Sequence, residues 1–238
     1  MRRSALPTSV PAPTAFLLLT PESPELRSAV VPPADVIVLD VQTSGRRGAA
    51  LAWLSSRTVT SPPVWLRLHA MGSDQLTADL VAFGDMADGI VLSGVRRSAD
   101  LDRVATHTGR TPLIPVVDSA AALLCAPSLA RHRRVGRLGF TSLAAAGDLT
   151  DDMLCPQNTA AWVHRHIAAA SAAARLPGPV GGLHPRPLDE DELRHEARTA
   201  HRAGFTGFCT STVRQVDAVR EVFQGGAARP VASAVTGA

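Results

Sequence analysis

Eight short apolar runs, rich in β-branched residues, recur along the chain, and each is followed by a segment with the apolar spacing of a helix. Several of the helical segments begin at Ser, Thr, Asp or Asn, which commonly cap helix N-termini. Strands that alternate with helices pair in parallel, and eight such units in 238 residues match a (β/α)8 TIM barrel in number and length. The predicted strands cover residues 16–20, 35–41, 64–69, 89–93, 113–118, 137–142, 179–184 and 204–211.

The alternative architecture is a doubly wound open sheet, in which strands also alternate with helices. Its dinucleotide-binding fingerprint, GxGxxG after the first strand, is missing from this sequence, so the barrel is favoured. We expect a single α/β domain over residues 15–224. The Pro-rich residues 1–14 and the Gly- and Ala-rich residues 225–238 are expected to form a flexible N-terminal arm and a flexible C-terminal tail.

The sequence contains no lysine, so all 24 of its Lys and Arg residues are arginine. Schiff-base aldolases, pyridoxal phosphate enzymes and P-loop proteins each require a lysine amine, which excludes these three classes. The net charge of +3 is spread along the chain, whereas nucleic-acid binding concentrates basic residues in one stripe. No run approaches the ~18 apolar residues of a membrane span, and three cysteines are too few for a disulfide framework. We therefore expect a cytoplasmic protein that binds neither nucleic acid nor membranes.

The polar residues at the strand ends are the candidates for function, because TIM barrels carry their active sites there. Alternation with a period of two puts Trp65, Arg67 and His69 on one face of their strand. An arginine inside a strand is costly unless it pairs with an anion, so Arg67 is the strongest candidate for substrate binding. The structural alternative is a salt bridge from Arg67 to Asp40 or Asp118 across the barrel mouth. The polar strand-end residues are Asp40, Arg67, His69, Ser93, Asp118, Ser142, His184 and Ser211.

The order of these strand ends resembles the citrate lyase β-subunit-like family, which is related to the 2-keto-acid aldolases of the phosphoenolpyruvate/pyruvate barrel superfamily. For example, ADVIVLDVQT stands where the family has GADxVxLDLED, and VWLRLH matches its VRIN strand. Seven segments match in register, and together they extend over nearly the whole chain. They are FLLLTPE (16–22), ADVIVLDVQT (34–43), VWLRLH (64–69), GIVLSGVRRSADL (89–101), IPVVDSAAALL (114–124), RLGFTSLA (137–144) and EARTAHRAGFTGFCTS (196–211).

The resemblance implies a carbon–carbon lyase that uses Mg²⁺ to stabilise an enolate, and a homo-oligomer, commonly a trimer or a multiple of three. In the family a glutamate and an aspartate hold the metal, at the positions of Asp118 and Ser142. The family's VRIN arginine, which matches Arg67, binds a carboxylate or keto group of the substrate. A hard cation such as Mg²⁺ prefers carboxylate oxygens and can act as a Lewis acid on the developing enolate.

The expected metal site has lost one negative charge, because Ser142 replaces the family's aspartate and Asp118 is one methylene shorter than its glutamate. Mg²⁺ binding is therefore expected to be weak or dependent on substrate. Asp148, Asp151 and Asp152 are alternative ligands in the following loop, although helix caps and solvated acids are the simpler interpretation. The other departures are Gln42 and Thr43 for two acids, His69 for asparagine, Ser93 and Gly94 for proline and lysine, and Thr210 and Ser211 for histidine and proline.

Two strand-end histidines, His69 and His184, are candidates for acid–base chemistry, and His69 is the stronger because its strand also carries Arg67. Arg67, His69 and Asp40 therefore form the candidate catalytic set. Four further arginines follow the second and fourth strands on the same rim. They favour an anionic ligand, such as an acyl-CoA or a small dicarboxylate, unless they are ordinary surface residues. These substrate-binding candidates are Arg46, Arg47, Arg96 and Arg97.

Two functions from different classes remain open. The first is a carbon–carbon lyase that cleaves or condenses a carboxylate or acyl-thioester substrate with the help of Mg²⁺. The second is a catalytically silent barrel that serves as a ligand-binding or partner subunit of an active homologue. A dependence of turnover on Mg²⁺ would separate the two.

Overall fold

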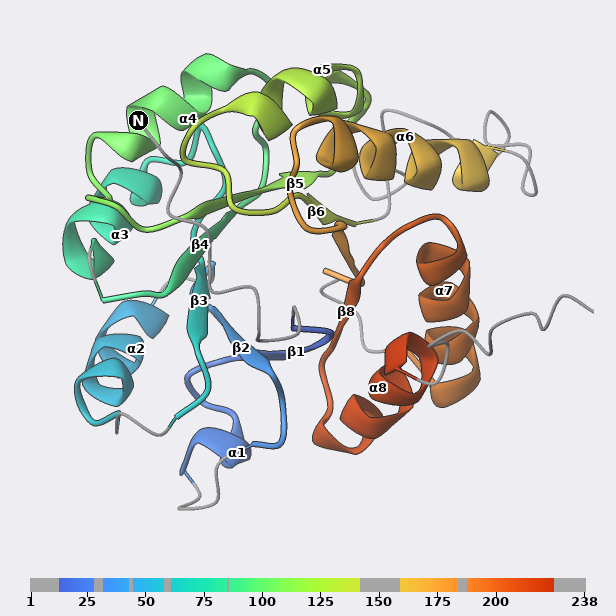
Figure 1. Cartoon of the computed structure of the whole chain (residues 1–238). Helices are drawn as coiled ribbons and strands as arrows, with labels where there is room; N and C mark the ends of the chain where they lie inside the picture. The colour runs from blue at the N-terminus through green and yellow to red at the C-terminus, as the bar shows by residue number, and fades with distance from the viewer. Residues whose placement is uncertain are drawn as a thin grey trace, which may run out of the picture.

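The chain folds into a closed barrel of eight parallel strands, in the order β1-β2-β3-β4-β5-β6-β7-β8, with helices around the outside (Figure 1). The computed structural model describes residues 13–27, 32–42, 45–57, 61–84, 86–141, 159–183 and 188–224. The first strand pairs in parallel with both the second and the last, and this pairing closes the sheet. The (β/α)8 barrel predicted from the sequence is therefore confirmed.

The strands and helices alternate strictly from Ala15 to Gln224. The strands are β1 Ala15–Leu19, β2 Val36–Asp40, β3 Val64–Arg67, β4 Gly89–Leu92, β5 Leu113–Val117, β6 Gly139–Phe140, β7 Val180–Gly181 and β8 Gly207–Thr210. The helices are α1 Pro24–Arg27, α2 Arg46–Ser55, α3 Gln75–Phe83, α4 Ser98–Ala105, α5 Ala120–Arg131, α6 Thr159–Ala173, α7 Glu190–Arg202 and α8 Val216–Gln224, with a 3-10 helix, η2, at Val213–Gln215. The C-terminal tail expected at residues 225–238, and all but two residues of the expected N-terminal arm, lie outside the described residues.

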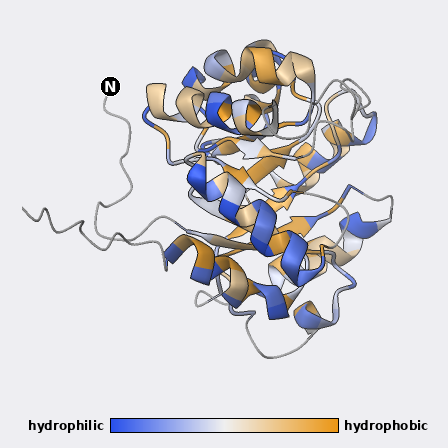
Figure 2. Ribbon diagram, turned by 90° about the vertical axis from the view of Figure 1, so that its right-hand side faces the viewer, coloured by the Kyte–Doolittle hydropathy of each residue, from blue (hydrophilic) through white to orange (hydrophobic). Residues whose placement is uncertain are grey.

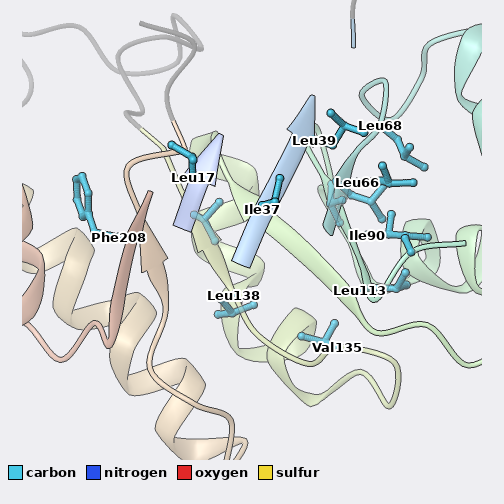
Figure 3. Packing of buried hydrophobic residues seen from close by; sticks show 14 of the residues in the cluster. Leu17, Ile37, Leu39, Leu66, Leu68, Ile90, Leu113, Val135, Leu138 and Phe208 are labelled. Atoms are coloured by element: carbon cyan, nitrogen blue, oxygen red, sulfur yellow. The ribbon is translucent and has the colours of Figure 1, made fainter. Parts of the chain in front are cut away.

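Alternate residues of the strands pack into two separate apolar clusters, as a period of two requires. One cluster joins strand residues, among them Phe16, Val38 and Ile114, with Leu183 just beyond β7, and fills the barrel. The other contains strand residues that Figure 3 shows, such as Leu17 and Leu66, together with buried helix residues. Alternate side chains of each strand therefore point into the barrel. Continued to the strand ends, this alternation places Asp40 of β2, Arg67 of β3 and Asp118 after β5 on the inward side.

Two strands are shorter than the sequence predicts, because β6 has two residues instead of residues 137–142 and β7 has two instead of residues 179–184. The chain leaves β7 at Gly182, whose φ of 72° is a left-handed conformation that favours glycine. A Cβ at Gly182 would also lie 2.4 Å from the carbonyl oxygen of Cys209. The close approach of β8 therefore requires glycine where the apolar pattern alone suggested a longer strand.

Arg137 closes the opposite end of the barrel, where the strands begin. Its side chain is 3 % exposed and reaches three segments that precede β1, β7 and β8. Nε donates to the carbonyl of Gly178 (2.7 Å), Nη1 to the carbonyl of Pro13 (3.0 Å) and Nη2 to the hydroxyl of Thr206 (2.6 Å). The guanidinium also lies 5.2 Å from the ring centroid of Phe16, which faces the barrel interior. At this end, one arginine thus donates a hydrogen bond from each of its three guanidinium nitrogens.

Hydrophobic residues dominate the strands, whereas most helices carry hydrophilic residues as well (Figure 2). This distribution is that of a barrel whose helices each bury one face against the sheet. Among the described residues, no helix has the length and apolar character needed to cross a membrane.

Candidate functional site

Arg67 and Asp40 are the last residues of β3 and β2, and they are paired in the register of the sheet. Arg67 Nη1 lies 3.6 Å from Asp40 Oδ2, which is close enough for an ion pair but long for a hydrogen bond. The Arg67 side chain is nevertheless buried, with 7 % of the residue exposed. Its Nε and Nη1 atoms have no hydrogen-bond partner within the described part of the chain. Arg67 therefore presents a largely unused guanidinium at the barrel mouth.

Asp40 is held in place by the chain that follows it, where the sequence departs from the family's acids. Its Oδ1 accepts a hydrogen bond from the backbone N–H of Gln42 (2.9 Å), and the Gln42 amide donates to the carbonyl of Leu68 (2.9 Å). Gln42 therefore ties the end of β2 to the chain just beyond β3. This arrangement fixes the carboxylate that faces Arg67.

Asp118 follows β5 directly and shares the barrel mouth with Arg67. Its Oδ2 accepts a hydrogen bond from the backbone N–H of Gly94 (2.7 Å), in the loop after β4. Burial raises the pKa of Asp118, and the Gly94 hydrogen bond and the charges of Arg96 and Arg67 offset only part of this effect. Asp118 is thus a desolvated carboxylate within electrostatic reach of two arginines.

His69 lies two residues beyond the end of β3 and contacts a carboxylate that the sequence analysis did not select. Its Nδ1 lies 2.6 Å from Oδ2 of Asp79 in α3, and its backbone N–H donates to the same oxygen (3.1 Å). Asp79 is 1 % exposed and lies among the buried residues of α3 with Leu76, Leu80 and Phe83. An aspartate within the apolar stripe of a predicted helix was the available signal, because such a residue is rarely buried without a partner.

Three of the four rim arginines are paired with carboxylates of the chain itself. Arg47 donates through Nε (3.0 Å) and Nη2 (2.7 Å) to Oδ1 of Asp79. Arg46 Nε lies 3.0 Å from Glu22, and Arg97 Nε lies 3.4 Å from Asp100.

Arg96 differs from these three, since its exposed side chain has no ion-pair partner among the described residues and acts electrostatically on Asp118. Arg96 is therefore the rim arginine most available to a ligand.

The described residues supply only part of the expected metal site. Ser142, the alternative ligands Asp148, Asp151 and Asp152, and the candidate base His184 lie outside them. In the described ranges, no group of three or more His, Cys, Asp or Glu residues is arranged to hold a metal ion. Asp118 is the described carboxylate at an expected metal position, and one carboxylate with substrate oxygens and water is a donor set that Mg²⁺ can use.

Cysteine chemistry is disfavoured at this mouth. Cys209 in β8 is buried, and this burial raises the pKa of its thiol to about 12, although the charge of Arg67 acts in the opposite direction. A thiol with so high a pKa carries almost no thiolate at neutral pH, so it is a poor nucleophile. The reactive groups of the mouth are therefore the arginines, the two aspartates and His69.

The fold is that of known proteins. No protein-family model matches the chain. The structure superposes on the citrate lyase β subunit of Mycobacterium tuberculosis with a TM-score of 0.72 and 23 % identity, over 89 % of this chain and 97 % of that one. It also superposes on the Mycobacterium tuberculosis protein CitE in complex with magnesium, acetoacetate and coenzyme A, with a TM-score of 0.73 and 21 % identity, over 90 % of this chain and 81 % of that one. The chain therefore has the barrel fold of the citrate lyase β subunit.

Relatives of this chain are also found by sequence alone. It is 28 % identical over 159 residues to a (3S)-malyl-CoA thioesterase of Cereibacter sphaeroides. The match covers 66 % of this chain and 55 % of the relative, so the chain spans about half the length of the curated relatives it matches. A further structural neighbour is RipC of Yersinia pestis, with a TM-score of 0.72 and 19 % identity, over 89 % of this chain and 94 % of that one. The resemblance inferred from the seven sequence segments is thus confirmed for the fold.

Proposed function

We propose that this barrel binds an anionic acyl substrate, a carboxylate or an acyl-CoA thioester, at its mouth, and that it cleaves or forms a carbon–carbon bond next to the substrate carbonyl. The observation that carries the proposal is the buried guanidinium of Arg67, whose Nε and Nη1 have no hydrogen-bond partner among the described residues. A buried donor without a partner costs ~1–3 kcal/mol, and this cost is removed when an anion accepts its hydrogen bonds. A carboxylate or a polarised carbonyl oxygen is the group that a guanidinium fork fits.

The residues around Arg67 have complementary roles in this proposal. Asp40, fixed by Gln42, orients the guanidinium through its ion pair at 3.6 Å. Arg96 is exposed at the rim and suits a more distant charge of the ligand, such as a coenzyme A phosphate. His69 carries the proton that must enter or leave the substrate when the carbon–carbon bond changes. Arg46, Arg47 and Arg97 act through their own carboxylate partners, so they are weaker candidates for direct contact.

Magnesium is the proposed cofactor, with Asp118 as its carboxylate ligand and the position of Ser142 as the degenerate one. When bound, the ion would polarise the substrate oxygens and stabilise an enolate. Neighbouring solved structures of CitE contain magnesium with acetoacetate and coenzyme A, or magnesium with acetate, which supports the cofactor class. The raised pKa of Asp118 fits this role, because a buried carboxylate gains from a nearby cation.

Thioester hydrolysis is a second candidate, and the contact between His69 and Asp79 favours it. A histidine oriented by a carboxylate can remove a proton from water, whose oxygen then bonds to the thioester carbonyl carbon. The carbon–sulfur bond breaks, and the thiolate takes up the proton from the imidazolium. The products are a free thiol and a carboxylic acid, which loses its proton to solvent and becomes a carboxylate. Arg67 would stabilise the negative charge that develops on the carbonyl oxygen. The curated relatives are (3S)-malyl-CoA thioesterases, which is consistent with this chemistry.

The decisive experiment incubates the full chain with malyl-CoA and related 3-hydroxyacyl thioesters, with and without Mg²⁺, and identifies the products by mass spectrometry. A lyase yields a shorter acyl-CoA and an oxo acid, and its rate should rise with Mg²⁺. A thioesterase yields free coenzyme A and the intact hydroxy acid. Binding without either product would favour the silent, ligand-binding barrel. If the chain neither binds these thioesters nor turns them over, the proposal is wrong.

Magnesium affinity tests the metal assignment independently of turnover. We expect calorimetry to show weak Mg²⁺ binding to the free protein, because only one of the family's two metal carboxylates is kept. Ser142→Asp should strengthen that binding, because it restores the second carboxylate. Tight binding to the unsubstituted protein would contradict the assignment and point to Asp148, Asp151 or Asp152 as a replacement ligand.

A further inference from the structure

Arg47, Asp79 and His69 form a hydrogen-bonded chain between the helical layer and the barrel mouth. Arg47 lies in the first turn of α2, Asp79 in the middle of α3, and His69 just beyond the end of β3. Asp79 Oδ1 accepts both bonds from Arg47, at 3.0 and 2.7 Å, and Oδ2 accepts both bonds from His69, at 2.6 and 3.1 Å. Each carboxylate oxygen therefore serves one neighbour.

The carboxylate is too deeply buried to be an ordinary surface partner. Asp79 is 1 % exposed, and the residues beside it on the buried face of α3 are Leu76, Leu80 and Phe83. Placing a carboxylate among apolar side chains costs several kcal/mol unless all its oxygens are hydrogen-bonded. The four bonds from Arg47 and His69 supply this compensation.

The chain fixes the protonation pattern of the imidazole when it is neutral. A carboxylate only accepts hydrogen bonds, so Nδ1 of His69 must carry the proton that lies between it and Asp79. Nε2 is then the nitrogen with a free lone pair. The second bond, from the backbone N–H of His69 to the same oxygen, holds the ring and the main chain to one carboxylate. The His69 side chain is 13 % exposed, so it is not closed off from solvent.

The other histidines of the described chain lack this arrangement. His164, His166 and His201 each have a buried ring nitrogen without a hydrogen-bond partner, and each packs against an aromatic ring. His132 does meet a carboxylate, that of Asp102, but this carboxylate is 68 % exposed. A buried, fully bonded carboxylate thus distinguishes His69, which also lies two residues after Arg67, the last residue of β3.

We infer that Asp79 is a positioning residue that, with Arg47 behind it, holds His69 with Nε2 as a proton acceptor at the barrel mouth. The inference rests on the proposed function for the reaction that uses the proton. The tautomer of His69, which the buried carboxylate of Asp79 sets, can be measured without any turnover.

The primary test is the tautomer of His69 in the ¹⁵N-labelled full chain, read from multiple-bond ¹H–¹⁵N spectra at alkaline pH, where imidazole is neutral. The His69 signals are assigned by their loss in His69→Asn. The expected result is a protonated Nδ1 and an unprotonated Nε2. Asp79→Asn should reverse this pattern, because an amide has one acceptor oxygen and cannot accept from both Arg47 and His69. A protonated Nε2 in the unsubstituted protein, or an unchanged tautomer in Asp79→Asn, would overturn the inference.

Kinetics then separates positioning from a purely structural role. With the thioester that turns over best, His69→Asn and Asp79→Asn should each lower kcat by about 10²-fold or more while KM changes little. His69→Asn keeps a side-chain donor for Asp79, so loss of the fold does not explain its effect. The matched control is Asp102→Asn, which removes the exposed partner of His132 and should leave both kcat and the His69 tautomer unchanged. A normal kcat in Asp79→Asn, despite a reversed tautomer, would show that the chain serves only the fold.

Arg47→Gln provides a second route if Asp79→Asn does not fold. It frees Oδ1 of Asp79, so the carboxylate can rotate, and both tautomers of His69 should become populated. An unchanged spectrum and an unchanged kcat would remove Arg47 from the inference. If the unsubstituted protein binds a thioester but turns none over, the proposed function fails, whereas the tautomer comparison still decides whether Asp79 sets the state of His69.

Discussion

The two ends of the barrel each bury an arginine, and the two arginines are treated in opposite ways. Arg137, at the end where the strands begin, is 3 % exposed and donates from all three guanidinium nitrogens to neutral oxygens. Arg67, at the end where the strands finish, is 7 % exposed and lies near two carboxylates, and its Nε and Nη1 have no hydrogen-bond partner in the described part of the chain. At one end the arginine is bonded within the protein, and at the other its donors remain available to a ligand.

This difference matches the general division of labour in TIM barrels, where residues at the N-terminal end serve stability and residues at the C-terminal end serve chemistry. Burial lowers the pKa of Arg137 to about 9, and among the described residues no carboxylate pairs with it; the hydrogen bonds to Pro13, Gly178 and Thr206 hold it instead. At the mouth, the unpaired guanidinium and the desolvated Asp118 are destabilising features that a bound ligand or metal would relieve. Of these two buried arginines, only Arg67 therefore has nitrogens without a hydrogen-bond partner among the described residues.

The largest expected effect is at the closed end. Arg137→Met should lower the free energy of unfolding by about 3 kcal/mol, because three hydrogen bonds from a buried charged group are lost, each worth ~1.5–3 kcal/mol, and relief of the buried charge offsets part of the loss. Chemical denaturation measures this change, and ligand affinity of the folded fraction should stay the same. Arg137→Lys keeps the charge but not the three-way fork, so it should recover only part of the stability. A stable Arg137→Met protein would contradict the assigned role of this end.

At the open end, we expect the opposite pattern for Arg67. Arg67→Met should weaken binding of an acyl-CoA or a small dicarboxylate by ~1.5–3 kcal/mol, the usual range for hydrogen bonds to charged groups. The free energy of unfolding should change by about 1 kcal/mol or less, because Nε and Nη1 have no bonds to lose. Calorimetry and denaturation on the same samples give both values.

Arg67→Lys sharpens this test, because it keeps the charge beside Asp40 and loses the two-point fork. An anchoring role predicts that the lysine variant keeps its stability and loses most of its ligand affinity. If the lysine variant instead loses stability and keeps its affinity, Arg67 has only a structural role in the barrel. The catalytically silent subunit then becomes a better interpretation than the enzyme.

The smallest expected effect is a gain of stability at Asp118. Burial raises the folded-state pKa of this carboxyl above its unfolded value, so its favourable contribution is complete below the unfolded pKa and is lost as pH rises through the folded pKa. At neutral pH the native state therefore carries a costly charge, and Asp118→Asn should stabilise the protein by about 0.5–1 kcal/mol. Thermal unfolding at neutral pH should show the gain, and the difference should disappear under acid conditions. A loss of stability at neutral pH would mean that Asp118 is a structural partner of Arg96 or Arg67.

The sequence by itself determined the barrel and the residues that share its mouth. Eight strand and helix units require a parallel sheet with crossovers, and the period of two carries Trp65, Arg67 and the residues after them along one face. Because parallel strands end at the same rim, the residues where β2, β3 and β5 end had to lie near one another. Asp40, Arg67 and Asp118 were therefore found together without any knowledge of their side-chain contacts.

Only the tertiary structure decided which charged groups are free and which are used. Arg47 meets Asp79 across 32 residues of sequence, and Arg137 meets Pro13 across 124, and such contacts depend on how helices and loops pack rather than on any local period. Adjacent arginines with the same sequence pattern thus differ, since Arg97 pairs with Asp100 whereas Arg96 faces Asp118. A pattern of residues fixes the direction in which a side chain leaves the backbone. The partner of that side chain comes from a segment that is distant in the sequence. For this reason only the tertiary structure distinguishes the closed end of the barrel from the open one.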